Sequence, residues 1–121
     1  MKLPSAEHPI SISPLNTRLI IKFKDVVVAQ SDTALTLEEA KYPAVFYVPR
    51  SDIYPEHFLR TEHSTYCPYK GAASYFSLLA LGETSENAVW SYEDPYPAMA
   101  QIKDHVAFYA DRVTVELEPV A

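Results

Sequence analysis

Short apolar runs rich in β-branched residues alternate with turn residues along most of the chain, a pattern that predicts β-strands rather than helices. The predicted strands span residues 19–23, 26–29, 34–37, 44–48, 72–81, 87–92, 106–109 and 113–117. Lys24 and Asp25 separate the first two strands and predict a two-residue hairpin, whose turn requires positive φ at both positions. About eight short strands at this spacing predict an antiparallel all-β architecture, either closed as a barrel or folded over on itself.

Four segments depart from the strand pattern. They are an extended N-terminal arm over residues 1–16, a short helix over 52–59, a loop over 64–71 and one helical turn over 98–102. The arm contains Pro4, Pro9 and Pro14, and proline lacks the N–H group that a central strand or a helix interior needs. We therefore predict a single compact β domain over residues 17–121, preceded by this arm.

Composition and charge narrow the range of partners. The 121 residues include 10 Lys and Arg against 16 Asp and Glu, which gives a net charge of −6. Nucleic acids and anionic membranes attract a basic surface, so we expect neither as a partner. The single cysteine, Cys67, excludes an intramolecular disulfide and fits a reducing compartment, so a cytoplasmic location is expected. No apolar leader follows Met1, and no uncharged run approaches the roughly 20 residues of a membrane span.

The segment from Thr65 to Gly71 is chemically the densest part of the chain, with a thiol, an amine, two phenols and a hydroxyl. A cation beside a thiol favours the nucleophilic thiolate, so Cys67 and Lys70 are the candidate catalytic pair. Tyr69 is a candidate ligand-binding residue in the same loop. The structural alternative is that Cys67 is buried, as free cysteines often are, and that Gly71 serves only the turn.

Two further pairs are candidate ligand-binding residues. Arg50 offers a planar guanidinium for a carboxylate or phosphate, although it could instead pair with Asp52 while that side chain caps the following turn. Trp90 and Tyr92 lie two residues apart and therefore face the same side of a strand, either in the core or on a ligand platform. The four histidines show no metal-ligand spacing, so no metal site is predicted.

Four sequence blocks carry a resemblance to a known family. They are Tyr47–Asp52, Cys67–Tyr75, Ala88–Tyr92 and Val106–Tyr109. The most specific part is Cys-Pro-Tyr-Lys-Gly at residues 67–71, followed by Trp-Ser-Tyr at 90–92. These blocks resemble domain of unknown function family 427, which also carries a nucleotidyltransferase-like label. The resemblance extends from about Arg18 to Val115.

The resemblance implies a compact β fold similar to the β-tent folds, which include the type B methionine sulfoxide reductases. Many β-tents bind zinc through two Cys-x-x-Cys pairs, but this chain has one cysteine, so the metal is not carried over and no cofactor is expected. The nucleotidyltransferase label finds no support in the residues. Such transfer needs carboxylates that hold metal ions, and only Glu116 and Glu118 alternate as a carboxylate pair.

The leading hypothesis is a small-ligand-binding domain, catalytic if Cys67 acts as a nucleophile. In this hypothesis Lys70 and Arg50 hold an anionic group, while Trp90 and Tyr92 stack on an apolar or heteroaromatic part. One alternative is a non-catalytic protein-interaction module, which is favoured by the acidic balance and by Tyr54, Tyr96 and Pro97 on predicted loops. Another is a redox enzyme of the methionine sulfoxide reductase type, with the thiol acting alone. A second copy of the chain is also a candidate partner.

Overall fold

The computed structural model describes residues 1–120 and confirms the antiparallel all-β prediction. The strands are β1 (Ile10–Pro14), β2 (Arg18–Phe23), β3 (Val26–Ser31), β4 (Leu35–Glu39), β5 (Val45–Pro49), β6 (Phe58–Cys67), β7 (Gly71–Ala80), β8 (Glu83–Ser91), β9 (His105–Phe108) and β10 (Thr114–Glu118). Short 3₁₀ helices follow β5 and β8: η1 (Arg50–Asp52), η2 (Pro55–His57) and η3 (Pro97–Ile102). None of the helices in residues 1–120 is long and apolar enough to cross a membrane.

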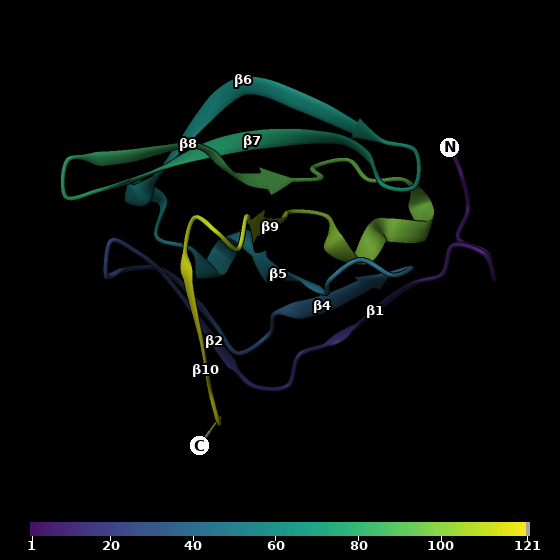
Figure 1. Cartoon of the computed structure of the whole chain (residues 1–121), viewed down its shortest axis with the longest axis horizontal. Helices are drawn as coiled ribbons and strands as arrows, with labels where there is room; N and C mark the ends of the chain where they lie inside the picture. The colour runs from purple at the N-terminus through teal and green to yellow at the C-terminus, as the bar shows by residue number, and fades with distance from the viewer. Residues whose placement is uncertain (121) are drawn as a thin grey trace.

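The strands form a seven-stranded sheet, in the order β1-β4-β5-β9-β8-β7-β6, and a three-stranded sheet, in the order β10-β2-β3. The larger sheet is narrow in its middle, because the short strand β9 pairs with β5 and with β8 through only two residues on each side. Figure 1 shows β6, β7 and β8 in a layer on the opposite side of the molecule from β1 and β4. The narrow middle therefore lets one sheet fold over on itself.

Two apolar clusters fill the fold, one between the two sheets and one inside the fold of the larger sheet. Strand β5 contributes side chains to both clusters, because its successive side chains point to opposite faces of the sheet. Phe46 and Val48 contact the first cluster, whereas Val45 and Tyr47 contact the second. Successive side chains of a strand point to opposite faces, so a strand between two packed layers has to be apolar at nearly every position.

The predicted hairpin between the first two strands is confirmed. Lys24 and Asp25 have φ values of 53° and 64°, and Phe23 pairs with Val26 across the turn. Positive φ at both central residues gives the turn a twist that matches the twist of the strands. The hairpin is therefore formed without glycine, at a conformational cost that the flanking apolar pairs offset.

The N-terminal segment contains a strand that the sequence prediction left out. Residues 10–14 form β1, which pairs with β4 from Ile10 opposite Glu39 to Pro14 opposite Leu35. The segment is extended, as predicted, but it is also part of the sheet. Prolines are tolerated there because β1 is an edge strand with one hydrogen-bonded neighbour.

The largest difference concerns the predicted helix over 52–59 and the predicted loop over 64–71. Two 3₁₀ turns occupy the start of this stretch, and β6 then runs from Phe58 to Cys67. β6 is the other edge of the seven-stranded sheet, and most of its side chains are exposed. A strand exposed on both faces carries polar residues at consecutive positions, so it lacks the alternation by which strands are predicted. The loop that remains is the three-residue turn over residues 68–70.

A cluster of charged side chains fastens β6 to the rest of the sheet. Arg60 of β6 and Arg50 of η1 both donate to the carboxylate of Glu93, at distances of 2.6 to 2.9 Å. Both guanidinium groups also lie over the ring of Phe76, 4.9 and 5.2 Å from its centre. The hydrogen bonds from Arg60, assisted by those from Ser74 and Arg50, outweigh burial and lower the pKa of Glu93 to about 2.

This cluster predicts an acid-dependent part of the stability. A carboxyl group whose pKa is lowered by folding stabilises the protein above its ordinary pKa, and that contribution is lost as the pH falls from about 5 to about 2. Glu93→Gln should therefore lower the free energy of unfolding by about 1 kcal/mol at neutral pH, since Arg60 is half exposed. Urea unfolding at several pH values measures this, and the variant should lose less stability on acidification than the wild type.

Glu116→Gln is the matched control, because Glu116 is more exposed than Glu93 and pairs with one basic residue, Lys22, on the three-stranded sheet. Its stability should stay within about 0.5 kcal/mol of the wild type. Equal effects of the two substitutions at every pH would contradict the assignment to Glu93.

Candidate functional site

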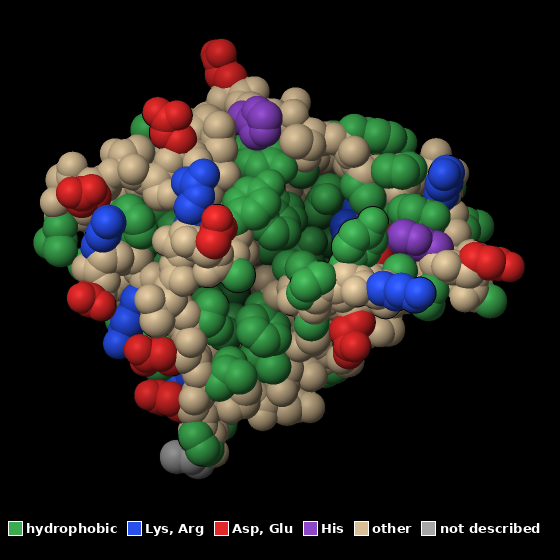
Figure 2. All heavy atoms as spheres, viewed as in Figure 1, with side chains coloured by type: hydrophobic (Ala, Val, Ile, Leu, Met, Phe, Trp, Pro, Cys, Tyr) green, Lys and Arg blue, Asp and Glu red, His purple; other side chains and the backbone are tan. Residues whose placement is uncertain are grey.

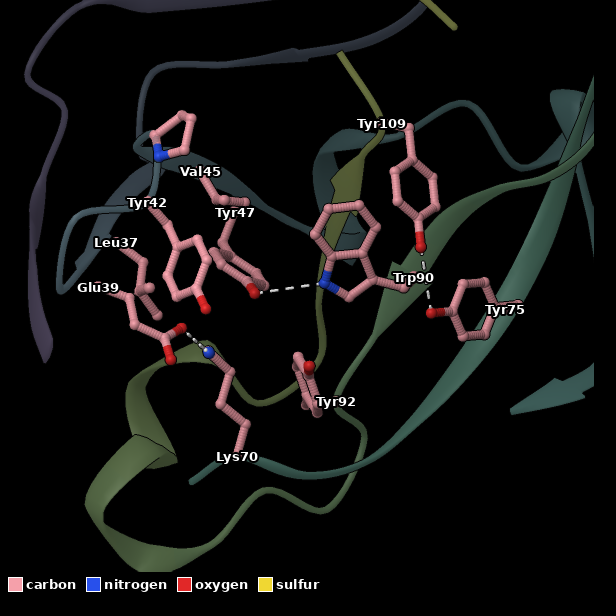
Figure 3. Close-up of a pocket in the computed structure, with 11 residues that line it drawn as sticks. Leu37, Glu39, Tyr42, Val45, Tyr47, Lys70, Tyr75, Trp90, Tyr92 and Tyr109 are labelled. Carbon is pink, nitrogen blue, oxygen red and sulfur yellow. Dashed lines mark hydrogen bonds and ion pairs between the residues drawn. The ribbon is translucent and has the colours of Figure 1, made fainter. Parts of the chain in front are cut away.

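A cavity of about 410 Å³ lies inside the fold of the seven-stranded sheet. Its walls combine aromatic and aliphatic side chains with one amine and one carboxylate, as Figure 3 shows. The lining residues are Leu37, Glu39, Tyr42, Pro43, Val45, Tyr47, Lys70, Tyr75, Trp90, Tyr92 and Tyr109. The cavity therefore brings together β4, β5, β7 and β8 with the turn before β7.

Strand alternation explains why polar groups reach this space. Leu37 and Glu39 lie two residues apart in β4, so the face that buries the leucine also turns the carboxylate inward. Trp90 in β8 and Tyr92 just after it share a face in the same way, as the sequence predicts. The strands β5, β7 and β8 each contribute one face to the cavity, while their other face packs into the cluster between the two sheets.

Lys70 enters the cavity from the turn between β6 and β7. Gly71, which follows it, has a φ of 107°, a value that side-chain-bearing residues rarely adopt. The carbonyl oxygen of Lys70 accepts a hydrogen bond of 3.0 Å from the N–H of Tyr96, which holds the backbone in place. The side chain is consequently only 6% exposed.

Glu39 and Lys70 form a buried ion pair at one end of the cavity. Lys70 Nζ donates to Glu39 Oε1, and His8 Nε2 lies 2.7 Å from the other carboxylate oxygen. Burial alone would raise the pKa of Glu39, but the hydrogen bonds from Lys70 and His8 together outweigh it and lower that pKa. The carboxylate is thus ionised at neutral pH and balances the lysine charge.

The aromatic walls are tied to one another by hydrogen bonds and ring contacts. Trp90 Nε1 donates to the hydroxyl of Tyr47 over 3.3 Å, and the ring of Trp90 packs 4.7 Å from that of Tyr109. The hydroxyls of Tyr75 and Tyr109 lie 3.3 Å apart. The bond with Tyr75 and burial raise the pKa of Tyr109 to about 12, and burial raises the pKa of Tyr47 as well. These two phenols therefore stay neutral at physiological pH.

Tyr92 differs from Tyr47, Tyr75 and Tyr109, whose hydroxyls bond to other residues of the wall. The residue is 8% exposed, and its hydroxyl group makes no hydrogen bond with a side chain of residues 1–120. Every fully buried side-chain N or O atom of these residues has a partner, so the Tyr92 hydroxyl must retain access to the open space. Figure 3 shows Tyr92 between Lys70 and Trp90. Burial raises the pKa of Tyr92, so the group is a neutral donor and acceptor for a molecule that enters the cavity.

A family comparison accounts for the chain over residues 11–119. The family whose model matches this range is described as "Domain of unknown function (DUF427)". The chain belongs to this family. The match covers all of the cavity wall and confirms the resemblance carried by the Cys-Pro-Tyr-Lys-Gly and Trp-Ser-Tyr blocks. No curated protein matches the chain closely enough to serve as a relative.

The DUF427 fold brings three of the predicted site residues into one cavity: Lys70, Trp90 and Tyr92. Cys67 does not line the cavity; it is half-buried against the apolar cluster inside the fold of the larger sheet, with its Sγ atom 3.9 Å from Lys70 Nζ. Tyr69 also lies outside the cavity. Its ring stacks on the ring of His8 at a centroid distance of 4.2 Å and so holds in place the histidine that bonds with Glu39. The dense loop of the sequence thus supplies one group to the cavity directly.

Arg50 and Asp52 do not line the cavity of this DUF427 domain. The ion pair expected between them does not form, because Arg50 binds Glu93 while Asp52 accepts a hydrogen bond of 2.6 Å from Ser31. Their separation follows from η1, which directs the two side chains to different neighbours. Within residues 1–120, no group of three or more His, Cys, Asp or Glu side chains is arranged to hold a metal ion.

Sequence reasoning missed several wall residues of the DUF427 domain: Glu39, Tyr42, Tyr47, Tyr75 and Tyr109. Four of the five are tyrosines in or beside predicted strands, where an aromatic residue is normally assigned to the hydrophobic core. The number of tyrosines, nine in 121 residues, was an available signal. Buried tyrosines need partners for their hydroxyls, and so many of them indicate a shared polar space.

The ion pair predicts a non-additive mutant cycle. Lys70→Met should lower the free energy of unfolding by about 2 kcal/mol, because it leaves a half-buried carboxylate with only His8 as a partner. The double variant Lys70→Met/Glu39→Leu should recover most of that loss, since it removes both buried charges. Denaturant unfolding at neutral pH measures the cycle. A double variant whose loss equals the sum of the single losses would contradict the pairing.

Proposed function

We propose that this DUF427 domain binds a small, flat, uncharged heteroaromatic ligand in the cavity of the larger sheet. The observation that carries the proposal is the aromatic-lined cavity together with the hydroxyl of Tyr92, which has no side-chain partner among residues 1–120 and is accessible to a group that enters this space. A ligand atom that donates or accepts a hydrogen bond would satisfy it. The cavity volume of about 410 Å³ lies in the usual range for small-molecule sites, which are mostly apolar with a few placed polar groups.

The aromatic walls support a flat ligand. Trp90 lies within the cavity wall together with Tyr47 and Tyr109, and their mutual contacts hold the rings in place before any ligand arrives. Rigid aromatic surfaces bind flat rings by stacking, and little entropy is lost when the walls are already ordered. The wall therefore favours a planar ring over a flexible aliphatic chain at this end of the site.

The charges favour a neutral ligand over an anionic one. Lys70 is the only basic residue of the wall, and Glu39 already neutralises it. Arg50, the second cation considered for an anion, binds Glu93 outside the wall. A bound anion would have to compete with the half-buried carboxylate of Glu39 for one ammonium group. The hydration free energy lost by the anion would then exceed the electrostatic attraction that it gains.

The position of Cys67 supports a binding function without a covalent step. Cys67 is half-buried against the apolar cluster, 3.9 Å from Lys70 Nζ, and it is not among the residues that line the cavity. A nucleophile has to approach the reacting atom of its substrate directly. We therefore propose a role for Lys70 in holding the ligand and none for the thiol in attacking it.

Nicotinamide and nicotinate are a matched pair of probes, because they share a ring and differ in charge. Trp90 is the only tryptophan, so its indole N–H gives a single NMR signal from inside the wall. Nicotinamide should shift this signal in a saturable manner, and nicotinate should bind more weakly. Tyr92→Phe should weaken nicotinamide binding about three- to tenfold, the value of one hydrogen bond.

Tyr54→Phe is the control, because Tyr54 is exposed and lies outside the cavity wall. It should leave the nicotinamide titration unchanged. The proposal is wrong if neither probe shifts the indole signal, or if both tyrosine variants bind nicotinamide as the wild type does. Tighter binding of nicotinate than of nicotinamide would also contradict the proposal, because it would show that the cavity prefers an anionic ligand.

A further inference from the structure

A second hollow, of about 510 Å³, adjoins the cavity on its outer side. It lies between the segment joining β4 to β5, the end of β9 and strand β10, and we name it the outer groove. Its lining residues are Ile21, Tyr42, Pro43, Ala44, Val45, Phe46, Trp90, Phe108, Tyr109, Ala110 and Val115. Five of these also line the cavity, namely Tyr42, Pro43, Val45, Trp90 and Tyr109. The two spaces are therefore adjacent and share a wall.

The polarity changes sharply across this common wall. No charged residue lines the outer groove, whereas the cavity contains the pair formed by Lys70 and Glu39. Figure 2 shows hydrophobic side chains gathered around a hollow at the centre of this face, with charged side chains mostly toward its margin. Tyr42 is 68% exposed at the rim, and Val115 is 39% exposed. An apolar surface of this kind is costly to leave in water and is typical of a binding site.

We infer that the ligand is amphipathic, with a flat polar head in the cavity and an uncharged apolar tail of several carbon atoms in the outer groove. This inference rests on the proposed function and adds the tail to it. Adjacency selects the occupant: because Tyr42, Trp90 and Tyr109 line both spaces, a substituent on a ring bound beside Trp90 would lie within reach of the groove. An apolar tail gains from every methylene that it buries there, while a charged tail would find no partner.

The inference is tested with nicotinamides carrying N-alkyl chains of increasing length, from methyl to octyl, by isothermal titration calorimetry. Affinity should rise about two- to fourfold for each methylene and level off when the chain outgrows the groove. Val115→Glu and, independently, Ala110→Glu place a charge in the groove and should abolish this rise. Both residues lie outside the cavity wall, so the affinity for nicotinamide itself should stay the same.

Leu117→Glu is the matched control, since Leu117 is an exposed residue of the same strand β10 and lies outside the groove. It should keep the full dependence on chain length. Binding of nicotinamide with no gain from the alkyl chain would overturn the inference and leave the proposed function intact. An equal gain in Val115→Glu and Leu117→Glu would also overturn it, because the chain would then bind elsewhere.

Two further outcomes separate the remaining explanations. If the groove variants convert a dimer into a monomer in sedimentation velocity while chain length has no effect, the groove is an interface between copies and the inference fails. If neither nicotinamide nor any alkyl derivative binds, the proposed function fails together with the inference.

Discussion

The strands β5, β7 and β8 have to bury both of their faces where they border the cavity, and the rest of the structure depends on this constraint. In β5, for example, Val48 serves the cluster between the sheets, while Tyr47 serves the cavity. The inward positions must be large enough to close the fold of the sheet and must also satisfy their own polar atoms. Tyr47 and Trp90 do both, because the indole donates to the phenol. The cavity is thus bounded by rings whose positions are set by the core behind them.

The ion pair between Glu39 and Lys70 adds little net stability by itself. When two charges are removed from water, their mutual attraction roughly offsets the hydration free energy that they lose. An apolar pair of the same volume would therefore stabilise the fold equally well. What the pair provides is a strongly polar end without net charge in an otherwise aromatic space. Such an end contributes little to folding but would orient a bound molecule, which is consistent with the proposed binding function.

The sequence predicts the parts of this fold that local chemistry decides. The Lys24-Asp25 hairpin and the shared face of Trp90 and Tyr92 follow from turn geometry and from strand alternation. The edge strands β1 and β6 escape prediction because an edge exposes polar side chains and tolerates proline. The role of Glu39 escapes it too, because only the long-range register of β4 brings this carboxylate to a lysine 31 residues away.

The Cys-Pro-Tyr-Lys-Gly block gains a physical explanation from this arrangement. The carbonyl of Pro68 accepts a hydrogen bond of 2.7 Å from the N–H of Lys2, and Tyr69 stacks on His8, so the turn is held from outside the sheet. Gly71 allows the backbone to reverse immediately after Lys70. A turn fastened on one side and free of a side chain on the other can direct a single long amine inward. The density of reactive groups in this block therefore reflects what it takes to bury one ammonium group, and no nucleophile has to be invoked to account for it.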